Sequence, residues 1–295
     1  MIKKILIVVA CSIRLLATAQ DVPFYEYNTS KINLNPAFAG SDSAFVLSTA
    51  GLAYPVSEMK NYRYFFSIDN YARFLRGGLA LNFAGRDEQD ISTAKLAISY
   101  APHFELFDHK LAFQPGVEFS YFETNGSFPG QLIFEDPDSI PGVNVVNGFD
   151  LSAGFLLFTK KFYGGMAFHH LSKNLYSSNF NDYQIPIKYA LHSGVNLNVG
   201  NFILSPNFLY MLQGDYRLLQ IGMRAKYQML TFGTDLSADV IIPGIGLQNH
   251  LFKLSYSYSY IIDPSTTRQY PSAHELHFNW FFKHKNKKKL SLRMI

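Results

Sequence analysis

Histidines and carboxylates gather at a few places in the 295-residue chain, and these are the residues best suited to chemistry. The run His274-Glu275-Leu276-His277 contains the residue types that bind zinc. The zinc-binding H-E-x-x-H motif places its two histidines four positions apart, one turn along a helix, whereas His274 and His277 are three positions apart. This spacing argues against a metal site, so we predict no metal or cofactor here.

Other candidate chemistry is sparse. His169 and His170 are neighbours at the end of a predicted strand, where alternation would send them to opposite faces and prevent them from chelating one ion. Acidic residues cluster at 86–90 and 135–138, and the second run could bind a divalent cation, but a solvated loop fits it better. The chain has no G-x-S-x-G nucleophile elbow and no phosphate-binding loop. We therefore predict that the protein is not an enzyme.

The elements that would position these residues are strands, because apolar residues recur with a period of two. In 187–197, 217–228 and 252–261, large apolar residues alternate with Ser, Gly, Asn, Gln and Lys. Each segment has about ten residues, which suits a tilted strand that crosses a bilayer. Aromatic residues gather near the strand ends, as in the aromatic girdles of membrane barrels.

Composition agrees with strands that face lipid. The chain is 48% hydrophobic, 16% aromatic and 16% charged, against about 25% charged in soluble domains. After the N-terminus no run of apolar residues is long enough for a transmembrane helix. A secreted sandwich or a soluble barrel would also alternate and stays the alternative. Our prediction is all-β: a transmembrane antiparallel β-barrel of fourteen strands.

The fourteen strands are expected near 44–54, 61–70, 77–84, 91–100, 110–122, 149–158, 162–170, 187–197, 202–211, 217–228, 230–237, 240–248, 252–261 and 273–282. The 240–248 strand contains Pro243, which cannot donate to the ladder. The short turns at 159–160, 199–200 and 228–229 share one rim, and short turns mark the periplasmic side. Without the 240–248 strand, the segment 262–272 would fall on that rim and the C-terminus would lie outside the cell, so an even strand number requires this strand. The long segments 123–148, 171–186 and 262–272 then lie outside the cell.

The two ends of the chain are basic. Lys3 and Lys4 precede an apolar run and an Ala17-Thr18-Ala19 site, so we predict a cleaved signal peptide at 1–19. A lipoprotein site at Cys11, the one cysteine, is the rival interpretation. Residues 283–295 form a basic tail. These ends carry nine basic residues and no acid, which exceeds the net charge of +4, so the body is acidic and a nucleic-acid partner is not expected.

Three motifs occur in order along the chain. Residues 35–40 read Asn-Pro-Ala-Phe-Ala-Gly, residues 257–260 read Ser-Tyr-Ser-Tyr, and residues 272–276 read Ser-Ala-His-Glu-Leu. In this order they resemble the PorP/SprF family of outer-membrane proteins of the type IX secretion system of Bacteroidota. The resemblance covers essentially the whole mature chain. Ala273 departs from the family pattern by separating Ser272 from His274, and Leu254-Ser255-Tyr256 replaces the usual glycine before the Tyr-Ser-Tyr run.

The resemblance implies a non-enzymatic outer-membrane component that assists secretion or surface attachment of a partner protein, such as a gliding adhesin. The implied partners are other type IX secretion components in the periplasm and outer membrane, a secreted surface protein and outer-membrane lipid. The alternative is a channel or hydrophobic-substrate transporter of the fourteen-stranded, plugged kind. Such a channel should have a charged constriction or a folded-in loop, whereas the predicted lumenal residues are mostly small and neutral.

The candidate site residues are the family-motif residues, to which we assign structural or docking roles: Asn35, Pro36, Ala37, Gly40, Tyr258, His274 and Glu275. Pro36 fixes its own φ and Gly40 permits a sharp turn, so 35–40 is expected to turn into the first strand. An N-terminal segment, 20–43, would then be periplasmic or form a plug before a barrel of 44–282. Glu275 and His277 should share the lumenal face of the last strand with Asn279.

Overall fold

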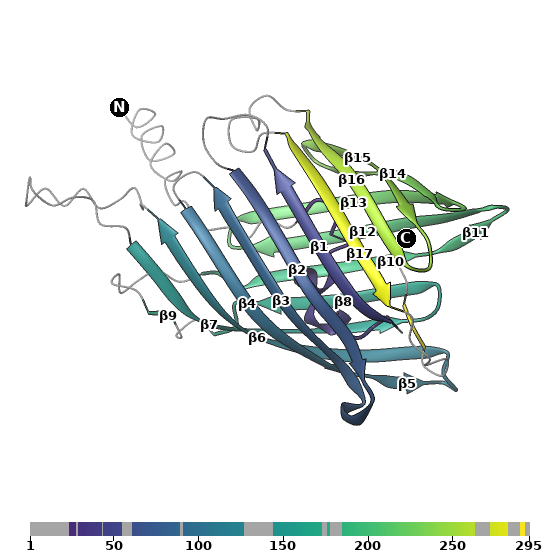
Figure 1. Ribbon diagram of the computed structural model, residues 1–295, viewed down its shortest axis with the longest axis horizontal. Coiled ribbons are helices and arrows are strands. Elements are labelled where there is room, and N and C mark those ends of the chain that lie inside the picture. Colours follow the sequence, from purple (N-terminus) through teal and green to yellow (C-terminus); the bar gives the residue numbers. More distant parts are fainter. Residues whose placement is uncertain are drawn as a thin grey trace, which may run out of the picture.

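The structure is a computed structural model of the chain, which forms one closed antiparallel barrel (Figure 1). It describes residues 24–27, 29–42, 44–54, 61–88, 91–126, 144–172, 176–177, 185–262, 272–282 and 290–292. The barrel closes where the first strand, β1 (Phe45–Ala53), pairs with the last, β17 (Ala273–Phe282), on one side and with β2 (Asn61–Ala72) on the other. Closure leaves no open sheet edge, which a strand protein needs in lipid.

Fourteen long strands of the described residues make the wall, each antiparallel to its neighbours. Besides β1, β2 and β17 they are β3 (Gly77–Glu88), β4 (Ile91–Pro102), β6 (Leu111–Gly126), β7 (Asn144–Phe158), β8 (Phe162–His169), β10 (Lys188–Val195), β12 (Phe202–Gln213), β13 (Tyr216–Tyr227), β14 (Leu230–Ser237), β15 (Val240–Gln248) and β16 (Phe252–Ile261). Three short strands extend the wall: β5 (Phe104–Leu106), β9 (Tyr176–Ser177) and β11 (Leu197–Val199). The helical turns are α2 (Lys31–Leu34), η1 (Pro36–Phe38) and η2 (Arg73–Leu75).

Each predicted strand coincides with one of these fourteen, so the predicted fold class is confirmed. The segment with Pro243 is strand β15, and it pairs with β14 throughout its centre. Its register with β16 runs from Ile241 to Gly244 without pairing the two residues between them, one of which is Pro243. The proline therefore interrupts one ladder locally without ending the strand.

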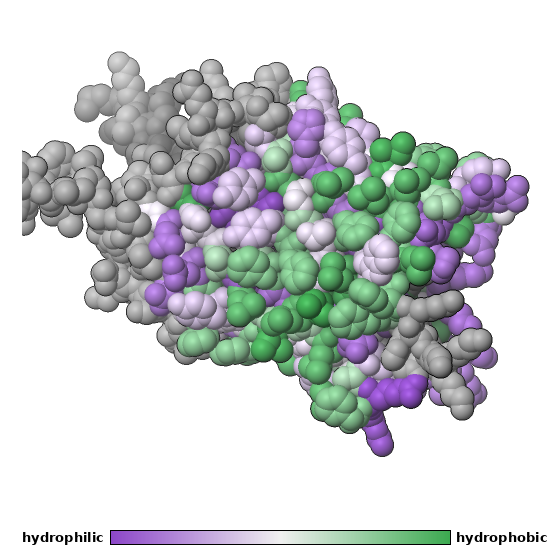
Figure 2. All heavy atoms as spheres, viewed as in Figure 1, coloured by the Kyte–Doolittle hydropathy of each residue, from purple (hydrophilic) through white to green (hydrophobic). Residues whose placement is uncertain are grey.

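The two faces of the wall meet different surroundings, as the alternation predicts. On β13, Leu219, Ile221 and Met223 are about half exposed on the outside, while Gln220 and Arg224 on the opposite face are buried inside. Figure 2 shows apolar side chains gathered over the middle of the outer wall, with hydrophilic ones toward both ends. An apolar outer band between polar rims fits a bilayer.

The strand directions place the turns 159–161, 200–201 and 228–229 at one end of the barrel, the short-turn rim. The connections from β6 to β7 and from β16 to β17 join strands at the opposite end, the long-segment rim. This is the arrangement expected from the sequence. The assignment of the short-turn rim to the periplasm remains a prediction, and residues 127–143 lie outside the described part of the chain.

The interior of the barrel is filled by the chain itself. The described residues between 24 and 42, which we call the lumenal segment, pack against strands on all sides; α2 and η1 appear in purple behind β1 and β2 in Figure 1. Phe24, Ile32 and Phe38 lie in one apolar cluster with Phe65 and Leu156 of the wall. Tyr27 and Leu34 form a second cluster with Ala167, Ala190, Leu209 and Met211. No helix of the described residues is long and apolar enough to span a membrane.

Replacing Ile221 by Arg should destabilise the folded barrel by about 2–4 kcal/mol, because its side chain lies outside at the middle of β13. The matched variant Met229→Arg places the same charge in an exposed turn at the short-turn rim, where about 0–1 kcal/mol is expected. Urea titration in lipid vesicles, followed by heat-dependent migration on a detergent gel, measures both. Equal effects at the two positions would contradict a lipid-facing β13.

Candidate functional site

The motif at 35–40 folds as a compact turn dictated by its own residues. Asn35 has an extended backbone (φ −151°), as the residue before a proline prefers, and its Oδ1 accepts a hydrogen bond from the Ala37 amide at 2.9 Å. Pro36 occupies the first helical position of η1, where its missing N–H costs nothing. Gly40 then adopts φ +61°, which side chains disfavour. The sequence thus sets the shape of the turn before it meets the wall.

Asn35 also anchors this turn to three strands. Its Nδ2 donates to the carbonyl oxygens of Phe155 on β7 at 3.1 Å and of Met166 on β8 at 3.3 Å. The same nitrogen lies 2.9 Å from Nε2 of His192 on β10. Asn35 is fully buried, so these contacts satisfy an amide that would otherwise be costly to place there.

Two glycines of the wall lie directly against the turn. A Cβ at Gly116 of β6 would lie 2.4 Å from the backbone nitrogen of Ala37. A Cβ at Gly78 of β3 would lie 1.9 Å from the carbonyl oxygen of Ala39 and 2.4 Å from the nitrogen of Gly40. Backbone therefore packs directly on backbone, which any larger residue on the wall would prevent. We call Gly78 and Gly116 the glycine seat, because they leave room for the backbone of the turn.

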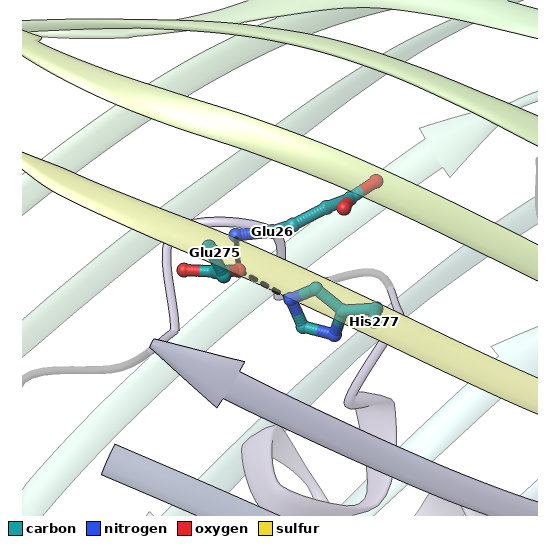
Figure 3. Close-up of side chains that lie close together, drawn as sticks. All are labelled: Glu26, Glu275 and His277. Carbon is teal, nitrogen blue, oxygen red and sulfur yellow. Dashed lines mark hydrogen bonds and ion pairs between the residues drawn. The ribbon is translucent and has the colours of Figure 1, made fainter. Parts of the chain in front are cut away.

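The other end of the lumenal segment is held by Glu275 of β17 (Figure 3). Its carboxylate accepts the backbone N–H groups of Tyr25 and Glu26, each at 2.7 Å. It also pairs closely with Nε2 of His277, two residues along the same face of the strand. The carboxylate thus fixes the backbone of the segment to the strand that closes the barrel.

Glu26 reaches in the opposite direction and completes a buried charge network, which we call the charge lock. Its carboxylate pairs with Nη1 of Arg224 on β13 at 2.5 Å and accepts from Oγ of Ser255 on β16 at 2.6 Å. Arg224 in turn pairs with Asp235 of β14. Glu26, Arg224 and Asp235 are all buried, so the attraction between opposite charges has to offset the cost of removing each charge from water.

The environment of Glu26 keeps it ionised. Burial alone would raise its pKa, but the positive charge of Arg224, then those of His277 and Lys253, and the Ser255 hydrogen bond lower the pKa to about 2. A lowered pKa means that the stabilisation is fully present above the ordinary value of 4.5 and is lost as the pH falls toward 2. The charge lock is therefore intact at neutral pH.

Glu26, Glu275 and His277 could place one ligand atom each within 4.8 Å of one another, a spacing that suits a metal ion. The carboxylates already have donors, however: Glu275 binds two amides and His277, while Glu26 binds Arg224 and Ser255. In Figure 3 the Glu26 carboxylate points away from the other two side chains. These three residues therefore serve to attach the lumenal segment to the wall.

The candidate motif residues fall into two groups. Asn35, Pro36, Ala37 and Gly40 lie inside the barrel at the glycine seat, and Glu275 lies inside at the opposite end of the same segment. Tyr258 and His274 are cross-strand partners on the outer face. There, Nδ1 of His274 lies 2.7 Å from the hydroxyl of Tyr256, and its ring centroid is 5.0 Å from that of Tyr258. Whether these motif residues act in docking remains a prediction.

One expectation about the lumen was wrong. His169 and His170 both point inward, because β8 ends at His169 and His170 adopts φ +61°, which breaks the alternation. The inner wall is mostly small and neutral, as expected, but it also holds buried charges, including Arg63, Arg224 and Lys253. In the sequence these inward charges stand alone on single strands, and a charge buried in a membrane strand requires a partner. This rule identifies Arg224 and Lys253 from the sequence as residues that need a partner. It does not identify Glu26, which lies outside the strands.

The family described as "Type IX secretion system membrane protein PorP/SprF" matches residues 16–280 of the chain. No curated protein matches the sequence. The fold is similar to that of solved outer-membrane barrels. The monoaromatic hydrocarbon channel TodX (a deltaS2S3 mutant) aligns over 84% of this chain and 92% of its own, with 11% identity and a TM-score of 0.51.

Two further barrels are more distant in structure. A FadL homologue of Pseudomonas aeruginosa has 10% identity over 86% of this chain and 94% of its own, with a TM-score of 0.45. CdiB from Acinetobacter baumannii has 11% identity over 81% of this chain and a TM-score of 0.43, and the chain spans only 60% of CdiB. At these identities the similarity concerns the fold alone.

Replacing Glu26 by Gln should loosen the lumenal segment while leaving the wall intact, because Arg224 loses a buried partner. Arg224 keeps Asp235, so the loss is that of a hydrogen bond between charged groups, about 1.5–3 kcal/mol, and hydrogen exchange at amides of 24–42 should accelerate by at least about tenfold. Mass spectrometry of exchange in detergent, with the peptides of β12 and β13 as internal reference, measures this. The control Asp87→Asn removes an exposed carboxylate that pairs only with the Tyr62 hydroxyl in the described residues and should change little. Unchanged exchange in Glu26→Gln would contradict the charge lock.

Proposed function

Because the chain belongs to the PorP/SprF family of type IX secretion system membrane proteins, we propose that it assists the secretion or surface attachment of a partner protein, such as a gliding adhesin. The protein lies in the outer membrane, as its family and its barrel fold indicate. Its periplasmic and outer-membrane partners would be other components of the same secretion system.

The family match carries this proposal, and the filled lumen supports it. The lumenal segment is fixed at both ends: Asn35 bonds to β7 and β8, and Glu275 and Arg224 hold Tyr25 and Glu26. A barrel plugged in this way would act through its rims and loops, where a protein partner can reach it, and not by conducting solutes. The protein would then serve as a docking platform without catalysis.

The test is deletion of the gene, followed by proteomics of the cell surface and medium. One or a few surface proteins should be lost or mislocalised, and the wild-type gene should restore them. The channel alternative makes a different prediction: purified protein would conduct ions or small solutes in planar bilayers with high open probability. An unchanged surface proteome together with a conducting barrel would overturn the proposal in favour of the channel.

We propose that the basic tail contributes to binding of the periplasmic partners. Within residues 283–295 the structure describes 290–292, and these contact β5 of the barrel and the lumenal segment. The Leu290 amide donates to Glu105 at 2.7 Å, the Leu292 amide donates to the carbonyl oxygen of Ser41 at 3.0 Å, and both leucine side chains are buried. We propose that the leucines anchor the tail while its lysines bind an acidic partner.

Two variants separate these roles. Deletion of 284–295 removes anchor and charge, whereas replacing Lys285, Lys287, Lys288 and Lys289 by Gln removes charge alone. If the lysines dock a partner, both variants should lose export of the partner protein while their barrels still show heat-dependent migration. Normal export in the Lys→Gln variant would overturn the docking role of the charges. Normal export in both would leave the tail no part in secretion.

A further inference from the structure

The two most exposed large apolar side chains of the described residues lie in turns at the short-turn rim. Phe74 of η2, between β2 and β3, is 84% exposed, and Phe107, between β5 and β6, is 75% exposed. The outward apolar residues of the strands reach at most 58%. Apolar groups that are this exposed mark a contact with lipid or with another molecule.

The two turns are neighbours in space. The amide of His103, just before β5, donates to the carbonyl oxygen of Arg76, just after η2, at 2.9 Å. In Figure 1 the turn from β2 to β3 and the strand β5 lie close together at the lower end of the barrel. We call residues 73–76 and 104–110 the rim lobe.

The rim lobe continues the outer, lipid-facing side of the wall. Tyr100 lies on the same face of β4 as the exposed Ile98, and its hydroxyl donates to the carbonyl oxygen of Leu75 at 2.8 Å. This bond holds η2 on the outer side. Phe104 of β5 is half exposed, and its ring stacks on that of Phe113 with 6.3 Å between the centroids. The apolar band therefore extends from the strands onto the turns.

The cations of the rim lobe lack acidic partners. Arg73, Arg76 and Lys110 are exposed, and no carboxylate in the described part of the chain forms an ion pair with any of them. Glu105 already contacts two neighbouring histidines, and Asp108 is the only other acid in the lobe. Three cations and one exposed carboxylate leave the surface of the lobe positive.

The backbone of the second turn is strained. Phe107, Asp108 and His109 have φ values of 52°, 53° and 64°, a left-handed conformation that residues other than glycine rarely adopt. Three such residues in succession are not expected from a turn whose only task is to join two strands. Strain of this kind is tolerated at functional sites, and here it accompanies the exposed ring of Phe107.

We propose that the rim lobe binds an anionic phospholipid of the leaflet at the short-turn rim. The rings of Phe74 and Phe107 would lie among the acyl chains, and the guanidinium groups of Arg73 and Arg76 would bind the phosphate, which an arginine can hold by two hydrogen bonds. Two observations favour a lipid over a protein partner: the lobe is continuous with the lipid-facing band, and its positive charge matches a phosphate. The proposal does not depend on the proposed function in secretion.

The test uses the full chain in vesicles of equal parts phosphatidylcholine and phosphatidylglycerol. Trp280 is the single tryptophan, so Trp280→Phe with Phe74→Trp places one fluorophore in the lobe. Bromine on the acyl chains of one lipid or the other quenches a tryptophan beside that lipid. The quenching should give a relative affinity of at least about fivefold in favour of phosphatidylglycerol, the factor that one charge near an anionic lipid contributes.

Adding Arg73→Gln and Arg76→Gln should abolish this preference, whereas adding Lys160→Gln and Lys161→Gln in another exposed turn of the same rim should preserve it. A tryptophan introduced by Ile221→Trp, on the outer face at the middle of β13, should show no preference. Heat-dependent migration verifies that each variant forms a barrel. Equal quenching by the two lipids in the lobe, no quenching by either, or equal losses in the two Gln variants would overturn the proposal.

Discussion

A bilayer offers no hydrogen-bonding partners to the backbone, and this constraint governs the architecture of the protein. Every N–H and C=O within the wall must find a neighbour, so the sheet has to close, which it does where β1 meets β17. A closed wall of fourteen strands encloses an interior that must hold either water or side chains. Here the lumenal segment fills much of the interior, and the residues of the inner wall are those that fit against it.

Filling a polar lumen brings charges together away from solvent. Arg224 pairs with Asp235 on the wall and with Glu26 of the segment, and Glu26 would be costly to bury without Arg224. The segment and wall are therefore specified jointly: apolar residues such as Phe38 give the contact area, while the charge lock and Asn35 fix one register. The glycines at 78 and 116 give the same specificity in steric form, since they admit backbone and exclude side chains.

The strands could be predicted because alternation is a local property, visible within ten residues of sequence. Each face of β13 or β16 follows from the order of its residues, and even the doubtful strand with Pro243 followed from the parity of the turns. The inward positions of Glu275 and His277 followed from the same rule. The turn at 35–40 was recognisable for the same reason, since Pro36 and Gly40 act on their own backbone.

The contacts between the lumenal segment and the wall could not be predicted, because they join residues far apart in the chain. Glu26 meets Arg224 and Glu275 across about two hundred residues or more, and no periodicity connects them. Gly116 looks like any strand glycine until Ala37 is placed against it. His170 shows the limit of the local rule, since one residue with positive φ at the end of β8 turned a side chain inward that alternation sends outward.

The position of Glu275 has a consequence for the order in which the molecule assembles. This residue lies on β17, the strand that completes the barrel, and it holds the backbone just upstream of the turn that leads into β1. A barrel that closed without the segment inside would leave Glu275 without its two amide donors and Arg224 without Glu26. Seating and closure therefore stabilise each other, and the seam is at its strongest only when the first residues of the fold are already in place. Folding of this barrel is thus coupled between its two ends, because the lumenal segment supplies contacts that stabilise the pairing of β17 with β1.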